Sequence, residues 1–105
     1  MYRTRAYTHE DEFAAAVKNW AEKLAPDVVR IRYSLEEDWT GAPAVFFNVL
    51  MTDDAVTDKR IREATKKVKW AIRDGMEPLE EWGVHPYFHY RSVSEQEQAK
   101  EPSWA

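Results

Sequence analysis

The sequence contains no cysteine, only three glycines among 105 residues, and no long apolar run. Without cysteine the chain forms neither a disulfide framework nor a thiolate zinc site, and it has no cysteine nucleophile. Three separated glycines do not build a phosphate-cradling loop, and a G-x-S-x-G elbow is absent. The amino-terminal stretch lacks the apolar core of a signal peptide. We therefore expect a cytoplasmic protein with no membrane span and no cofactor, and no residue is singled out as catalytic.

What is present is enough apolar material for a core. Apolar residues make up 44% of the chain and aromatic residues 13%, including five tryptophans. A chain of this length suits one domain. The net charge of −4 hides an asymmetry, because residues 59–73 hold seven basic residues and one acidic residue. A basic segment on an acidic body favours phosphates, acidic proteins or the acidic part of a second copy as partners.

Residues 9–25 show the pattern of an amphipathic helix. Thr8 is a suitable N-cap, and Pro26 ends the run. The apolar residues recur at helical spacing and predict a buried stripe of Phe13, Val17, Trp20, Ala21 and Leu24.

A second helix is predicted to run to about Asp74. Asp54 or Thr57 is the expected cap, and Gly75 stands just past the expected end. Its apolar stripe contains Ile61, Ala64, Thr65, Val68, Ala71 and Ile72.

Three segments read as strands. Residues 28–35 alternate between apolar and polar, whereas residues 44–51 are apolar on both faces. An antiparallel hairpin is the simplest connection between these two strands. Residues 84–93 alternate again, and Pro86 places this third strand at a sheet edge, or lies at the strand start or a bulge.

The order helix, strand, strand, helix, strand predicts a two-layer α+β fold with both helices on one face of a three-stranded sheet. We expect a single domain over residues 1–93 and a polar tail over residues 94–105, with Trp104 as its candidate anchor. Matching the alternations gives the covered sheet face as Val29, Ile31, Tyr33, Val45, Phe47, Val49, Phe88 and Tyr90.

The opposite face of the sheet is the main functional candidate, because two helices cover only one face. We call it the outer face. Several adjoining apolar side chains on one face usually mark a binding surface. A second copy stacking on it, or a terminal segment folding over it, is the favoured occupant, and single-stranded nucleic acid is the alternative. The predicted partner-binding residues there are Arg30, Arg32, Phe46, Asn48, Leu50, Tyr87, His89 and Arg91.

The basic helix is the second candidate surface. Trp70 falls nearly opposite the apolar stripe, with Lys66, Lys67 and Arg73 as its neighbours on the helix. Lysine stems in a cation-π contact, the tail, a protein partner or nucleic acid could each cover the ring.

Two residue patterns are typical of metal binding or acid-base catalysis, but the expected geometry argues against both. His85 and His89 would point the same way on a strand but lie about 13 Å apart, too far to share one metal ion. The acidic turn 36–38 is expected near His85, where a surface ion pair is favoured over acid-base catalysis.

The stretches "RYSLEEDWTGAPAVFFNVL" and "WGVHPYFHYRSVSEQ" resemble segments of small bacterial proteins without a settled function. The resemblance implies a bacterial origin. Some small bacterial proteins of this size are partners of a toxin or a nucleic-acid enzyme, which makes an antitoxin-like role one alternative. The predicted function is a non-catalytic protein-protein interaction domain that associates with itself as a homodimer, with a nucleic-acid-binding module as the runner-up.

Overall fold

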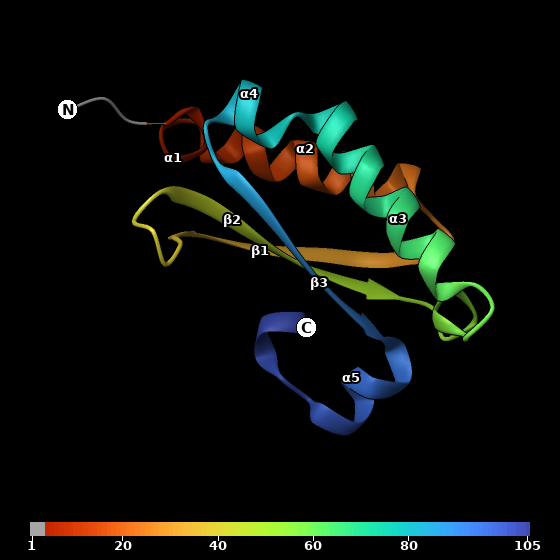
Figure 1. Ribbon diagram of the computed structural model, residues 1–105. Coiled ribbons are helices and arrows are strands. Elements are labelled where there is room, and N and C mark those ends of the chain that lie inside the picture. The colour runs from red at the N-terminus through yellow and green to blue at the C-terminus, as the bar shows by residue number, and fades with distance from the viewer. Residues whose placement is uncertain (1–3) are drawn as a thin grey trace.

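The computed structural model describes residues 4–105 and has an α+β fold with a three-stranded sheet, as predicted (Figure 1). No helix in this described part is long and apolar enough to cross a membrane. In chain order the elements are α1 Arg5–Thr8, α2 Glu10–Lys23, β1 Val28–Glu37, β2 Pro43–Met51, the 3-10 turn η1 Asp54–Val56, α3 Ile61–Ala71, the π-helical turn η2 Ile72–Met76, α4 Pro78–Trp82, β3 His85–Ser92, α5 Val93–Ala99 and the 3-10 turn η3 Pro102–Trp104.

The sheet has the order β1-β2-β3, so β2 is central and both other strands are edges. β1 and β2 form the predicted antiparallel hairpin. β3 runs parallel to β2, which the intervening α3 and α4 make possible, because a parallel neighbour needs a crossover connection. Pro86 lies in the edge strand β3, one of the positions that the sequence predicted for it.

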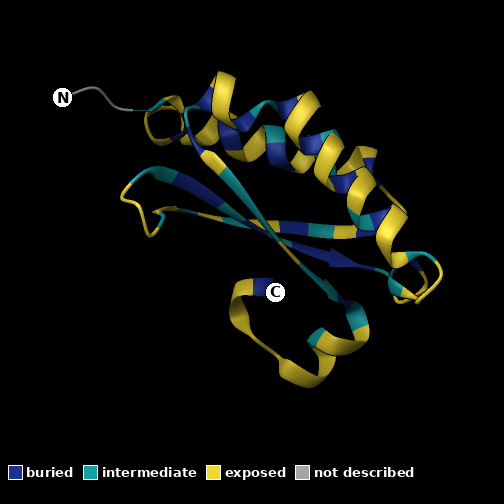
Figure 2. Cartoon of the chain, in the orientation of Figure 1, coloured by how far each residue is buried: buried dark blue, intermediate teal, exposed yellow. Residues whose placement is uncertain are grey.

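The main core lies between the sheet and the helices α2 and α3, which share one face of the sheet (Figure 1). Figure 2 shows the buried positions concentrated on the facing surfaces of these elements. Phe13, Phe47, Met51 and Ile72 are among the largest fully buried side chains. α5 and η3 lie on the other side of the sheet, against the outer face (Figure 1).

Val29 departs from the predicted face assignment. The register shifts between Val28 and Arg30, where Val28 pairs with Met51 and Arg30 pairs with Leu50. Val28 is therefore the inward residue, at 3% exposure, and Val29 is 47% exposed. A β-bulge of this kind inserts one residue and changes the side to which its neighbours point. Alternation alone does not reveal it.

The helix ends also differ from the sequence prediction. Thr8 does not cap α2, because its hydroxyl donates to the carbonyl of Thr4 instead. α3 begins at Ile61 with no side-chain cap, and Asp54 accepts an ion pair from Arg60. Gly75 lies inside the η2 turn, not beyond the helix end, and a Cβ there would overlap the indole ring of Trp20. The glycine thus lets the turn approach α2 closely.

Candidate protein-binding surfaces

The C-terminal segment covers much of the outer face. η3 contacts β1 and β2, and its backbone is held by polar side chains of that face. Three side chains donate hydrogen bonds to backbone carbonyls of the segment: Arg30 to Trp104 at 3.1 Å, Arg32 to Ala105 at 2.7 Å and Asn48 to Ser103 at 3.2 Å. The residues expected to contact a partner on this half of the sheet contact the chain's own tail instead.

Trp104 is buried at 6% exposure, in keeping with its expected role as an anchor. The guanidinium of Arg91 lies 4.6 Å from the centre of its ring and makes a 2.9 Å ion pair with Glu101. Leu50, on the same sheet face, is only 4% exposed. The prediction of an open surface is therefore wrong at Leu50, and Arg30, Arg32, Asn48 and Arg91 serve to hold the tail.

A capping box turns the chain at the end of β3. The Ser92 hydroxyl accepts the Glu95 N–H at 3.1 Å, and the Glu95 carboxylate accepts the Ser92 N–H at 3.1 Å. Asp53 accepts from both the hydroxyl and the backbone N–H of Ser94, and these bonds lower the pKa of Asp53. The S-x-x-E spacing is a sequence signal for the start of a helix, and it predicts α5 where we expected a polar tail.

The uncovered part of the outer face carries an aromatic cluster, defined here as Trp39, Phe46 and Tyr87. The Phe46 and Tyr87 rings stack with centres 5.0 Å apart, and the Trp39 ring lies 5.3 Å from Tyr87. Trp39 is 80% exposed, more than any other large apolar side chain in the described residues. Phe46 and Tyr87 were expected on this face, whereas Trp39 was not among the predicted site residues. His89 is exposed and pairs in register with Asn48.

Asp38 fixes the turn that carries Trp39. One carboxylate oxygen accepts the Thr40 hydroxyl at 2.6 Å and the backbone N–H groups of Thr40 and Ala42. The other oxygen accepts the Tyr87 hydroxyl at 2.8 Å. The Thr40 hydroxyl first, and then Tyr87, lower the pKa of Asp38 to about 2. Hydrogen bonds to the ionised carboxylate thus hold the turn that carries Trp39.

His85 is placed neither for metal binding nor for acid-base catalysis with the acidic turn. In the acidic turn 36–38, the Asp38 carboxylate accepts the Tyr87 hydroxyl. No hydrogen bond joins His85 to that turn within residues 4–105. The same described part contains no cluster of three or more His, Asp or Glu side chains placed to hold a metal ion.

A basic groove lies between α3 and β3. It has a volume of about 360 Å³ and is lined by Thr65, Lys66, Lys69, Trp70 and Tyr90. Lys67 is exposed but does not line this groove. Burial raises the pKa of Tyr90 to about 12, so this phenol stays neutral.

Trp70 is 47% exposed, and Arg73 provides its cation-π contact, with the guanidinium 5.3 Å from the ring centre. The tail does not cover Trp70, because α5 and η3 lie on the other side of the sheet (Figure 1). The ring is thus partly covered by an arginine of the following η2 turn and remains half-exposed.

No protein-family model, curated protein or solved structure matches this chain.

Proposed function

We propose that this protein is a non-catalytic protein-protein interaction domain and that the aromatic cluster is its partner-binding anchor. The observation that carries the proposal is the exposure of Trp39, 80%, on a turn held by four hydrogen bonds to Asp38. Tryptophan and tyrosine dominate interface hot spots. A turn that is already ordered loses little backbone conformational entropy on binding, which favours affinity.

The tail restricts which partner can reach the outer face. Two copies stacking their outer faces flat on each other would meet α5 and η3, which stand on that face (Figure 1). Displacing them would expose Trp104 and break three hydrogen bonds to the tail backbone. We therefore narrow the predicted open-face interface to the aromatic cluster, and propose a different protein that fits beside the tail as its partner.

The test compares two tryptophan variants of a tagged chain in the cells that make it. Trp39→Ala should lose the co-purified partner, because it removes the anchor. Trp70→Ala is the matched control, since Trp70 is also exposed but lies on α3, away from the cluster. The proposal is wrong if both variants retain the same partners as the unaltered chain.

A second function, binding of single-stranded nucleic acid, is favoured by the groove between α3 and β3. Lys66 and Lys69 could contact phosphates there while a base stacks on Trp70, the arrangement that single-strand binders use. Fluorescence anisotropy of a labelled oligothymidine at two salt concentrations tests it. Binding that weakens steeply with salt and disappears in a Lys66→Glu, Lys69→Glu double variant is expected. No binding at low salt would rule it out.

A further inference from the structure

β1 is an edge strand, and the edge that faces away from β2 is a further candidate for an interface. β1 spans ten residues, contains no proline, and pairs only with β2 among the described strands. An edge strand of this length presents a row of unpaired backbone N–H and C=O groups, which template the addition of another strand. The opposite edge, β3, is interrupted by Pro86. β1 is therefore the better edge for strand addition.

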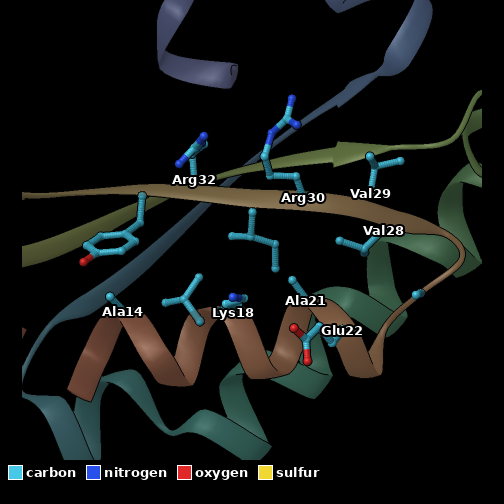
Figure 3. Close-up of a pocket in the computed structure, with 12 residues that line it drawn as sticks. Ala14, Lys18, Ala21, Glu22, Val28, Val29, Arg30 and Arg32 are labelled. Carbon is cyan, nitrogen blue, oxygen red and sulfur yellow. The ribbon is translucent and has the colours of Figure 1, made fainter. Parts of the chain in front are cut away.

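An apolar groove runs beside this edge, between β1 and α2 (Figure 3). Its volume is about 570 Å³. Figure 3 shows Ala21 of α2 near Val28 across the groove, while Val29, Arg30 and Arg32 point away from the helix. The small alanines of α2 line the groove beside the strand, and Val29 is 47% exposed on the opposite side of β1. The groove and the strand edge form one continuous surface.

We propose that β1 pairs in antiparallel fashion with β1 of a second copy, with the two-fold axis at Tyr33. This register keeps inward residues opposite inward residues, as a continuous sheet requires. It places Ile31 opposite Leu35 of the second copy on the helix side. It places Arg30 opposite Glu36 of the second copy on the outer side. Symmetry repeats each pair, and the result is a six-stranded sheet with two α2 helices on one face.

The charge order of β1 is the argument for a second copy as the occupant. The first half of the strand carries Arg30 and Arg32, whose guanidinium groups also donate to carbonyls of the tail, and the second half carries Glu36 and Glu37. Antiparallel pairing brings the basic half of one strand to the acidic half of the other, and shifting the axis to Ser34 still sets Arg32 opposite Glu36. Opposite charges across a strand pair stabilise it, and like charges destabilise it. The strand is thus complementary to itself.

This interface goes beyond the proposed function, because the aromatic cluster takes no part in it. Phe46 and Tyr87 lie on β2 and β3, and Trp39 lies in the turn beyond the end of β1, outside the residues that the proposed register pairs. Each dimer would carry two copies of the cluster. Loss of the dimer would therefore leave each cluster intact, and loss of the cluster would leave the dimer intact.

Crosslinking is the first test, and the absence of cysteine makes it clean. Ser34 is exposed near the proposed axis, so Ser34→Cys should be joined to its copy by a short bifunctional thiol reagent. Glu97→Cys on α5, also exposed, is the control for random collision. Efficient crosslinking at position 34 and not at 97 is expected. Equal yields at the two positions would overturn the proposal.

Charge reversal is the second test. Glu36→Lys should weaken the dimer at least about tenfold in sedimentation equilibrium, because symmetry places two like-charged pairs opposite each other. Glu97→Lys makes the same charge change on α5 and should leave the dissociation constant unchanged, as should Trp39→Ala. Circular dichroism checks that each variant is folded. A monomeric wild-type chain, or a dimer unaffected by Glu36→Lys, would overturn the proposal.

Discussion

The hydroxyl of Tyr87 donates a hydrogen bond to the carboxylate of Asp38 across 2.8 Å, and so ties the edge strand β3 to the turn between β1 and β2. The rings of Tyr87 and Trp39 lie 5.3 Å apart beside this bond. The position of the most exposed tryptophan in the described residues therefore depends on a bond between residues 49 positions apart.

Tyr87→Phe should raise the pKa of Asp38 from about 2 toward 3.8, its ordinary value, without reaching it, because the Thr40 hydroxyl remains the larger cause. A carboxyl whose folded pKa is lowered stabilises the fold above its unfolded pKa, and this contribution is lost as the pH falls toward 2. In the variant, the pH range over which this stabilising contribution is lost should be narrower, because the folded pKa lies closer to the unfolded pKa. Carboxyl-carbon NMR of Asp38 measures the shift.

Tyr90→Phe is the control. The Tyr90 hydroxyl donates to the Thr65 carbonyl on the other face of the sheet, away from Asp38. The control variant should leave the pKa of Asp38 unchanged. If Tyr87→Phe and Tyr90→Phe both leave it unchanged, the Tyr87 bond does not exist in solution.

Trp104→Ala should lower the free energy of unfolding by about 3 kcal/mol, because it removes a buried aromatic side chain from beneath Arg91. Trp39→Ala removes the same side chain from an exposed site and should cost less than about 1 kcal/mol. Urea unfolding followed by far-UV circular dichroism measures both. Equal costs would mean that the tail does not pack on the outer face.

Gly75→Ala should destabilise the fold by about 1 to 3 kcal/mol, because the added methyl group overlaps the Trp20 ring. The neighbouring exposed residue supplies the control, and Asp74→Ala should change stability by no more than about 0.5 kcal/mol. Thermal unfolding of the two variants provides the comparison. A Gly75→Ala variant as stable as the wild type would show that the η2 turn sits farther from α2.

Asp53→Asn should loosen the start of α5, because Asp53 accepts hydrogen bonds from the hydroxyl and N–H of Ser94. Hydrogen exchange of the amides in residues 94–99 should become faster. Asp58→Asn, in the loop before α3, is the control and should leave these amides unchanged. Unchanged exchange in Asp53→Asn would mean that the capping box alone fixes the helix start.

The sequence predicted the parts of the fold that depend on local periodicity. The α+β class, the β1-β2 hairpin and the edge position of Pro86 follow from alternation, turn residues and the missing N–H of proline. The bulge at Val29 could not be predicted, because the register shift arises from pairing with β2. Local pattern does not contain information about that pairing.

The candidate site was only partly predictable. Arg30 and Trp104 are 74 residues apart in sequence, so nothing local indicates that the tail covers Leu50 and holds Arg91. Trp39 stands alone in a polar turn and belongs to no periodic pattern. Its importance emerges only once β3 is placed beside β2, where Tyr87 and Phe46 stack.

The central claim is that the aromatic cluster binds a protein partner, and site-specific photocrosslinking at position 39 tests it most directly. A benzophenone-bearing phenylalanine analogue would replace Trp39, and the same analogue at Glu97 would serve as the matched control on α5. The account predicts one defined protein adduct from position 39 and none from position 97. Adducts of equal yield and identity from both positions, or none from position 39, would contradict it.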